Sequence, residues 1–459
     1  MKYYSPEQKA TIFVVIITSF IATFTGSALN LSIPAMSKAF NVSAATIGWI
    51  VTSAMLTPAA LAVPFGRLAD ITEKRRIFIL GLLIFSVSSL FAAFAFNFTV
   101  MIVLRVAQGV GSAMVFSTAT AILISAFPGS DRGKVLGYSV AATYIGLSSG
   151  PVAGGILNHY LGWPSIFIMT FLFTAAAFFI SVAKLPKSET RRSGMSFDIP
   201  GNVIYIIMIV TIMYGFSEIA VFRFSAALIG LGVVLAVYFV IHELRIESPI
   251  IQVRLFTGNI AYSFSNLATL MNYAATFAIG YLLSIYFQVV MRYSSQTAGL
   301  MLISQPIVMA LISPYAGRLS DRVSPYKLAS LGMGFCAAGL LFFVFITENY
   351  PLWLITLALI VTGIGFGLFS SPNTNAVMAC VEAKDYGVAS SILATMRSLG
   401  HTASMAIVTL VVRTHMGSTA LVEARPGVLI ETMHTAFIIF TCICAVGIFF
   451  SAIRKKDGV

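Results

Sequence analysis

Two apolar stretches of this sequence each contain an arginine close to a second polar residue. Arg105 is followed by Gln108, and Arg397 by His401. The four-residue spacing of Arg397 and His401 places both side chains on one face of a helix. Histidine titrates near neutral pH and can carry a proton, although a neighbouring cation favours its neutral form. A charge inside a membrane span costs at least about 2.5 kcal/mol, so both arginines are expected to face protein or a wet cavity.

Each of these side chains also has a plain structural explanation. Arg105 could tie helices together through backbone carbonyls, and the sequence supports this as well as it supports a part in proton transfer. His401 could be a neutral packing residue, which the adjacent Arg397 favours. Both interpretations stay open at this point.

The acidic residues offer no second proton site within the apolar stretches. None of the 16 Asp and Glu residues lies near the middle of such a stretch, whereas proton coupling usually relies on a titratable group there. Glu218, at the end of one stretch, comes nearest. A glutamate at the membrane surface explains Glu218 better than a proton site does.

The composition indicates a membrane protein. Hydrophobic residues make up 58% of the chain and charged residues 10%, with a mean hydropathy of +0.93, whereas soluble domains carry about 25% charged residues. Apolar runs of about 20 residues, enough to cross roughly 30 Å of hydrocarbon, fill almost the whole length. The net charge of +12 arises in short loops between these runs, which indicates membrane orientation rather than nucleic-acid binding. The four cysteines show no metal-ligand spacing.

The runs predict an all-α polytopic protein with fourteen transmembrane helices. The predicted spans are residues 11–34, 47–67, 77–96, 99–124, 135–158, 164–183, 201–217, 223–241, 260–290, 297–316, 327–346, 351–375, 386–412 and 431–453. Polar segments divide them into an N-terminal six-helix bundle, a linker with two extra spans, and a C-terminal six-helix bundle with a tail. These three parts are residues 1–183, 184–259 and 260–459.

The loops also predict the orientation. With the N-terminus inside, most of the 28 Lys and Arg residues fall on the cytoplasmic side, as the positive-inside rule requires. Both termini are then cytoplasmic in a multi-pass protein of the cell membrane, whose first span is not cleaved.

A charged turn occurs twice and relates the two halves. The first copy, Gly66 to Arg76, puts six ionisable residues into eleven positions, and a degraded copy runs from Gly317 to Lys327, eight predicted spans later. An offset of eight rather than six indicates that two spans were inserted between two parallel six-helix repeats. Parallel repeats of this kind are typical of secondary transporters.

At these turns the sequence resembles the major facilitator superfamily, and specifically its fourteen-span drug:proton antiporter branch. The family's loop motif, Gly-x-x-x-Asp-Arg-x-Gly-Arg-Arg, is matched at Gly66, Asp70 and Arg75, with departures at Ile71 and Glu73. The resemblance implies that the turns latch the halves in one state, and the plain alternative is charge that only sets topology. The implied switch-loop residues are Gly66, Asp70, Arg75, Arg76, Gly317, Asp321 and Arg322.

The fifth predicted span matches the branch's antiporter motif, Gly-x-x-x-Gly-Pro-x-x-Gly-Gly, at every fixed position. The matching residues are Gly146, Gly150, Pro151, Gly154 and Gly155. Glycines four apart allow a neighbouring helix to approach closely, and Pro151 removes one amide hydrogen bond. The resemblance favours export over import.

Other segments are similar to the branch at single positions. In the first span Asn30 matches, but Thr25 stands where the branch usually has Asp. The segment around Pro372 frees backbone carbonyls beside two amides and can line a pathway, or it can simply end a helix. The residues that we expect in the substrate and proton pathway are Thr25, Asn30, Arg105, Gln108, Asn373, Asn375, Arg397 and His401.

These observations predict a secondary transporter that exports hydrophobic or amphipathic, drug-like small molecules by alternating access. Proton antiport is implied by the resemblance. The alternative is a carrier of a lipid-like, neutral or anionic metabolite with weak or no proton coupling, since Thr25 replaces the expected acid and two arginines would attract an anion. An enzyme is not expected, because no nucleophile–base pair or catalytic acid pair is present in the sequence, nor is a channel, because no filter-like segment is seen.

The expected partners follow from that function. They are a small-molecule substrate, protons and membrane lipids. We expect no cofactor, no metal, no nucleic acid and no obligatory protein partner.

Overall fold

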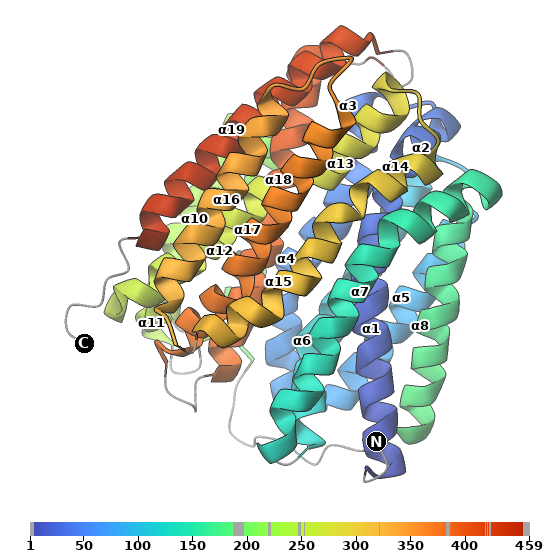
Figure 1. The fold of residues 1–459 in the computed structure, drawn as a ribbon. Helices are drawn as coiled ribbons and strands as arrows, with labels where there is room; N and C mark the ends of the chain where they lie inside the picture. The colour runs from blue at the N-terminus through green and yellow to red at the C-terminus, as the bar shows by residue number, and fades with distance from the viewer. Residues whose placement is uncertain are drawn as a thin grey trace.

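The computed structural model is all-helical in the part that it describes. That part comprises residues 4–127, 129–186, 197–218, 222–246, 249–251, 253–320, 322–381, 386–417, 419, 421 and 424–452. The helices run up and down beside one another, with both chain ends toward the lower edge of the bundle (Figure 1). We call the edge that holds the chain ends the termini side and the opposite edge the far side.

Along the chain, the helices form two groups. Between these groups in the sequence lie two further helices, which we call the middle pair. The first group contains α1 (Pro6–Asn30), α2 (Ile33–Phe40), α3 (Ala44–Ile47), α4 (Trp49–Ile71), α5 (Lys74–Ala92), α6 (Phe98–Ser125), α7 (Gly129–Leu161) and α8 (Pro164–Lys184). The middle pair is α9 (Ile199–Ser217) and α10 (Ser225–Arg245), followed by the short α11 (Val253–Gly258). The second group contains α12 (Ile260–Thr276), α13 (Ile279–Ile285), the π-helical turn η1 (Tyr286–Val290), α14 (Ser295–Leu302), α15 (Ser304–Ser320), α16 (Pro325–Val344), α17 (Leu352–Met378), α18 (Tyr386–Met416) and α19 (Pro426–Ala452).

Local sequence explains where several of these helices begin. The hydroxyl of Ser5 accepts the Gln8 amide at 3.1 Å while the Gln8 side chain accepts the Ser5 amide, which is a capping box at the start of α1. Gln8 also donates to the carbonyl of Ala126 at 2.9 Å, so the start of α1 lies against the end of α6. Proline opens α8, α16 and α19, where its missing amide hydrogen costs nothing.

Twelve segments of the described chain are long and apolar enough to cross a membrane. The expected all-α membrane architecture is therefore confirmed. Of the fourteen predicted spans, twelve correspond to these segments. The remaining two predicted spans, 135–158 and 386–412, lie on α7 and α18, which are 33 and 31 residues long. Most helix ends lie within five residues of the predicted span ends, as α17 illustrates by covering Leu352–Met378 where 351–375 was expected. The start of α7 lies six residues before its predicted span, and the predicted spans 260–290 and 297–316 are each divided among shorter helices.

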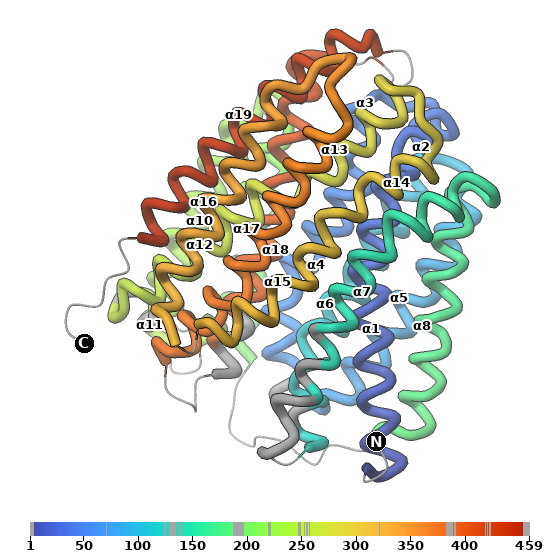
Figure 2. The backbone as a smooth tube through the Cα atoms, viewed as in Figure 1, coloured from blue at the N-terminus to red at the C-terminus, as the bar shows by residue number. Residues whose placement is uncertain are grey.

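The largest buried apolar cluster joins the two groups on the far side. It brings Phe24 and Met36 of the first group together with Tyr281, Phe287 and Met405 of the second. The far-side course of α13 and α14, with the turn between them, is clear in Figure 2.

The apolar clusters nearer the termini side belong to single groups. One joins α1, α5, α6 and α8 around Phe78 and Leu82, and another joins α12, α17 and α18 around Tyr262 and Ile392. The described groups thus pack on each other mainly through their far-side halves.

The middle pair lies across the boundary between the groups. The Tyr205 hydroxyl of α9 donates to the Ala59 carbonyl of α4 at 3.1 Å, and both residues share an apolar cluster with Leu399 of α18. By contrast, α10 is the least buried of the twelve candidate spans. Of the middle pair, α9 is therefore the helix that contacts both groups.

Candidate functional site

The far-side boundary between the groups is closed by hydrogen bonds to backbone carbonyls. Three side chains of the second group donate to carbonyls of the first. They are Ser284 to Asn30 at 2.5 Å, Gln288 to Leu31 at 3.0 Å and Ser295 to Gly155 at 3.1 Å. A backbone bond from Ala44 to Thr419, 3.0 Å long, adds a further link. These contacts seal the far side in the conformation described here.

The antiporter-motif residues form part of this seal. A side chain at Gly146, Gly150 or Gly154 would collide with α1, near Phe20, Ser27 and Ala28 respectively. Across the boundary, Gly155 meets the Ser295 carbonyl, and Gly299 of α14 meets the Pro151 carbonyl, each too closely for a β-carbon. The motif therefore lets α7 touch both groups, one on each face.

Glu218 joins the middle pair to both groups. Its carboxylate accepts the Trp49 indole N–H of α4 at 2.9 Å and is paired with Arg413 of α18. Glu218 is only 7% exposed. The sequence predicts a glutamate at the membrane surface, whereas the carboxylate of Glu218 links α9 to α4 and α18 on the far side. We call Trp49, Glu218 and Arg413 the far-side junction.

Arg105 has the contacts of a helix-tying residue. Its Nε donates to the Ile50 carbonyl at 2.9 Å, its Nη1 donates to Gln108, and Gln108 donates to the Ser89 hydroxyl at 2.7 Å. Arg105 is 3% exposed, and its guanidinium lies 6.0 Å from the Phe167 ring centroid. These bonds join α6 to α4 and α5, so the structural explanation accounts for Arg105, and a part in proton transfer stays a prediction.

Most other predicted pathway residues also bond within one group. Thr25 shares a 2.9 Å hydrogen bond with Thr170 inside the first group. Asn373 donates to Thr269 at 2.7 Å and Asn375 to Ser320 at 2.6 Å, both inside the second group. Asn30 differs, because its side-chain oxygen is buried without a hydrogen-bond partner while its carbonyl accepts Ser284.

Arg397 and His401 lie together with aromatic side chains, as their helical spacing predicts. The Arg397 guanidinium is 5.8 Å from the Tyr273 ring centroid and donates to the Thr374 hydroxyl at 2.9 Å. The His401 ring lies 5.1 Å from the Tyr273 ring and 4.2 Å from the Phe277 ring. We call Tyr273, Phe277, Thr374, Arg397 and His401 the central cluster.

The first group contributes to this region through Tyr144 of α7. Its hydroxyl hydrogen-bonds the Ser313 hydroxyl of α15 at 2.9 Å, and its electrostatic neighbours include Tyr273 and Arg397. The sequence singled out Arg397 and His401 but not Tyr144, Tyr273 or Thr374. A lone tyrosine in an apolar run has no distinctive spacing, and only its position two residues before Gly146 hinted at Tyr144.

The guanidinium of Arg397 has fewer hydrogen-bond partners than that of Arg105. The Nε of Arg397 is buried without a hydrogen-bond partner, and no carboxylate pairs with Arg397 among the residues that the structure describes. Arg397 nevertheless sits in mid-helix between the groups and is partly exposed. The central cluster therefore offers one uncompensated positive charge beside aromatic rings.

The switch-loop residues lie at the termini side. Arg75 donates to the carbonyls of Leu185 and Val182 at 2.9 and 2.8 Å, at the end of α8, where a cation is favoured by the helix dipole. Arg76 is largely exposed and pairs with Glu73 at 2.6 Å.

The remaining switch-loop positions carry less information. Gly66 has ordinary contact with Ser117, and Gly317 lies close to Ser371. Arg322 is exposed, whereas the side chain of Asp70 and the whole of Asp321 lie outside the described residues. The latch that was expected between halves therefore stays a prediction.

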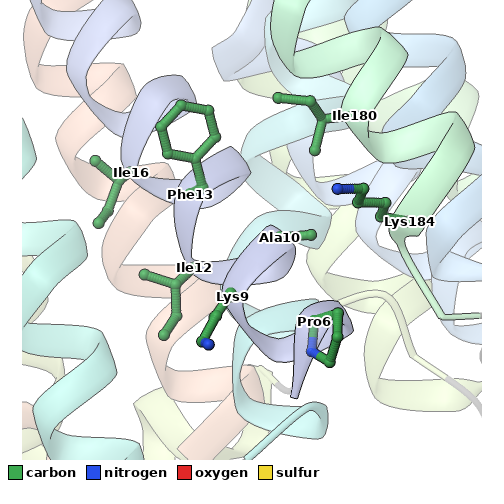
Figure 3. A pocket seen from close by; sticks show the side chains of 8 residues that line it. All are labelled: Pro6, Lys9, Ala10, Ile12, Phe13, Ile16, Ile180 and Lys184. Carbon is green, nitrogen blue, oxygen red and sulfur yellow. The ribbon is translucent and has the colours of Figure 1, made fainter. Parts of the chain in front are cut away.

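A groove of about 520 Å³ opens elsewhere, between the termini-side ends of α1 and α8 (Figure 3). Its lining is Pro6, Lys9, Ala10, Ile12, Phe13, Ile16, Ile180 and Lys184. None of the predicted pathway residues lies in it. An apolar wall with two lysines fits lipid tails and headgroups at the membrane surface better than a transport site.

Sequence comparison places these features in a known family. A sequence profile described as Major Facilitator Superfamily matches residues 15–242 and 266–458. The riboflavin transporter RibZ of Clostridioides difficile (strain 630) is 30% identical over 403 residues, covering 86% of each chain. The multidrug resistance protein Stp of Mycobacterium tuberculosis is 26% identical over 384 residues, covering 83% of this chain and 71% of Stp.

The fold is also shared with solved structures. A bacterial homologue of the human lysosomal transporter Spinster, in an inward-facing and unoccupied conformation, has a TM-score of 0.67 and 14% identity, covering 98% of this chain and 97% of that chain. At this identity the likeness concerns the fold alone. Because the family profile spans most of the chain, the protein belongs to the Major Facilitator Superfamily and is a secondary transporter, not an enzyme.

Proposed function

We propose that this transporter exports amphipathic aromatic small molecules by alternating access and that the structure represents its cytoplasm-open state. The observation that carries the proposal is the one-sided distribution of contacts between the groups. Hydrogen bonds and the largest apolar cluster join the groups on the far side, whereas termini-side clusters stay within a group. Rocking about the central region would open the far side and close the other.

Connectivity supports fourteen spans rather than twelve. The end of α6 lies on the termini side because Ala126 is bonded to Gln8, while the start of α8 lies on the far side, where Trp163 is 5.4 Å from Phe40. Since α7 joins these two points, it has to cross. The same reasoning applies to α18, which connects Cys380, bonded to Asn259 at the start of α12, with Thr419 on the far side.

The proposed domains follow from these crossings. Residues 1–183 and 260–459 form the two rocking six-helix bundles, and residues 184–259 carry the extra pair. The termini side is taken as cytoplasmic because its loops collect the basic residues. The central cluster would then load substrate from the cytoplasm, in agreement with the export that the antiporter motif favours.

The central cluster supports the choice of substrate class. Tyr273 and Phe277 offer ring faces, and Arg397 offers a donor without a partner, its Nε, in mid-helix. Aromatic faces beside a few polar groups bind planar molecules through ring contacts and orient them through hydrogen bonds. The names of RibZ and Stp, which refer to riboflavin and to multidrug resistance, are compatible with such substrates.

The charge of the site favours neutral or anionic substrates over cationic drugs. Arg397 lacks a carboxylate partner among the described residues. A cation beside it would be repelled in a medium of low dielectric constant, and an anion would be attracted. The metabolite carrier that the sequence left as an alternative is thereby favoured over a carrier of cationic drugs.

Proton coupling is proposed through His401. Its imidazole stands among aromatic rings one helical turn from Arg397. Antiport requires that substrate and proton occupy the site in turn. A planar substrate against Tyr273 and Phe277 would exclude water from the imidazole and favour release of its proton.

The proposal is tested with purified protein in liposomes and a set of planar probes that differ in charge. Riboflavin is neutral, flavin mononucleotide adds a phosphate to the same ring system, and ethidium is a planar cation. We expect transport of the flavins and little transport of ethidium, with an internal pH dye reporting proton movement for the native protein and less of it for His401→Gln.

The outcomes separate the parts of the proposal. Transport of ethidium alone would contradict the assigned substrate charge. Flavin transport that ignores an imposed pH gradient, in the native protein, would rule out antiport. Unchanged coupling in His401→Gln would remove that residue from the proton path.

A further inference from the structure

Three ionisable side chains meet at the termini-side end of the middle pair, far from the central cluster. Asp198 precedes α9, and His242 and Glu243 lie in the last turn of α10. The Nε2 of His242 is 2.8 Å from Oδ2 of Asp198, and possible ligand atoms of all three residues lie within 4.8 Å of one another.

The two carboxylates of this cluster are deeply buried. Asp198 is 6% exposed and Glu243 is 3% exposed. Asp198 also accepts the Gly201 amide at 3.0 Å, and one oxygen of Glu243 accepts the Ile251 amide at 2.8 Å. The other Glu243 oxygen, Oε1, is buried without a hydrogen-bond partner. That orphan oxygen is unusual, because buried carboxylate oxygens normally accept hydrogen bonds.

Among the described residues, no permanent positive charge is paired with this cluster. No lysine or arginine is paired with Asp198 or Glu243 within the described residues, so His242 is the one basic group shown in contact with them. Two buried carboxylates facing one imidazole leave negative charge that water does not screen, which is costly unless another cation joins them.

We propose that Asp198, His242 and Glu243 bind a divalent transition-metal ion of the Zn²⁺ type. Zn²⁺ accepts imidazole nitrogen and carboxylate oxygen together, and its usual bond lengths of about 2.0–2.2 Å put neighbouring ligand atoms roughly 3.3 Å apart in a tetrahedral site. The Asp198–His242 pair is slightly closer than this spacing and Glu243 Oε1 has to approach. Small side-chain rotations therefore form three ligands, and water completes the set.

The bound ion would join the two helices of the middle pair at their termini-side ends. Asp198 caps α9, His242 and Glu243 end α10, and Glu243 also holds the Ile251 amide, shortly before α11 and α12. A metal bridge would therefore act as a staple at the base of the middle pair. The site stands apart from the proposed transport function, and it leaves the central cluster untouched.

The test uses full-length protein in detergent, stripped with a chelator and titrated with ZnCl₂ alone. We expect one tightly bound zinc by elemental analysis and a higher melting temperature that depends on zinc concentration. Glu243→Gln, His242→Gln and Asp198→Asn should each weaken zinc binding at least about 10- to 100-fold, the loss seen even when a group that only orients a ligand is removed.

These variants are chosen to keep the fold. Asparagine still caps α9, and glutamine keeps the shape of Glu243, so a melting temperature measured without zinc shows whether each variant is folded. His159→Gln, at the exposed far end of α7, controls for zinc held by a surface histidine and should change nothing.

Two results would overturn the proposal. One is zinc binding of equal strength in all three cluster variants, which would place the metal elsewhere. The other is no zinc binding in the native protein. The zinc-free melting temperature of Glu243→Gln would in that case be expected to rise. A proton on Glu243, rather than a metal, would then neutralise the cluster.

Discussion

At the scale of single residues, two arginines inside helices have opposite surroundings. Arg105 has backbone and amide acceptors on α4 and α6, whereas Arg397 has one hydroxyl partner, a buried free Nε and a tyrosine ring. The sequence could not distinguish them, because both stand in apolar runs beside polar residues. The Ile50 carbonyl and the Thr374 hydroxyl come from other helices, which only the fold brings close.

This contrast predicts different effects of replacing the two arginines. Arg397→Gln should weaken binding of flavin mononucleotide about 10- to 100-fold, corresponding to a lost charged hydrogen bond of about 1.5–3 kcal/mol. Binding of riboflavin should change much less, and Arg397→Lys should restore part of the loss. Tryptophan fluorescence quenching by each flavin measures these affinities.

Arg105→Gln is the matched control for that prediction. It leaves the Ile50 carbonyl and Gln108 without their partner, so it should lower the melting temperature without changing the preference between the two flavins. Equal loss of both flavins in Arg397→Gln would contradict the assigned role of Arg397.

At the scale of helices, α9 is the member of the middle pair that contacts both groups on the far side. Glu218 at its end holds Trp49 of α4 and Arg413 of α18. The helix ends could be predicted from the length of the apolar runs, and the orientation from the positions of the basic loops. The junction could not, because its three residues come from distant parts of the chain and none lies in a motif.

Glu218→Gln should shift the protein toward the far-side-open state. Removing one partner of a fully buried ion pair costs about 3–5 kcal/mol, and the 19% exposure of the Arg413 side chain reduces this cost. A shift of at least about tenfold in the equilibrium is expected, since tenfold corresponds to 1.4 kcal/mol. Spin labels at Asn97 and Asn349, in exposed far-side loops, should report longer distances.

The termini-side pair Thr72 and Ser324 should report shorter distances in the same variant. Glu348→Gln, at an exposed far-side glutamate, is the control and should leave both distances unchanged. Unaltered distances in Glu218→Gln would show that the junction does not hold the far side closed.

At the scale of the whole molecule, one-sided closure predicts one-sided access. Ser370→Cys, next to the central cluster on α17 and partly exposed, should react with a charged maleimide applied from the cytoplasm. Ser284→Cys, buried in the far-side seal, should stay unreactive from either face. Labelling of inside-out and right-side-out vesicles, in a background lacking the exposed Cys442, measures both.

Reaction of Ser370→Cys from the outside alone would reverse the proposed sidedness.

Much of the architecture was predictable from the sequence, because the thickness of the bilayer sets helix length and the spacing of the two charged turns indicates how many helices lie between them. The open side and the cluster residues were not predictable, since they depend on which faces of α7, α12 and α18 meet.

The two groups contribute different kinds of atoms to the hydrogen bonds of the far-side seal. This difference affects which residues of the seal can be substituted. In the three side-chain bonds described above, the first group supplies only backbone carbonyls, at Asn30, Leu31 and Gly155. Every amino acid carries that acceptor, so substitutions at Asn30 and Leu31 leave it in place as long as the helices keep their course, whereas Gly155 is held to glycine by the close Ser295 carbonyl. The strength of the far-side bonds is thus adjustable through a serine, a glutamine and a second serine of the second group, without a matching change of side chain in the first.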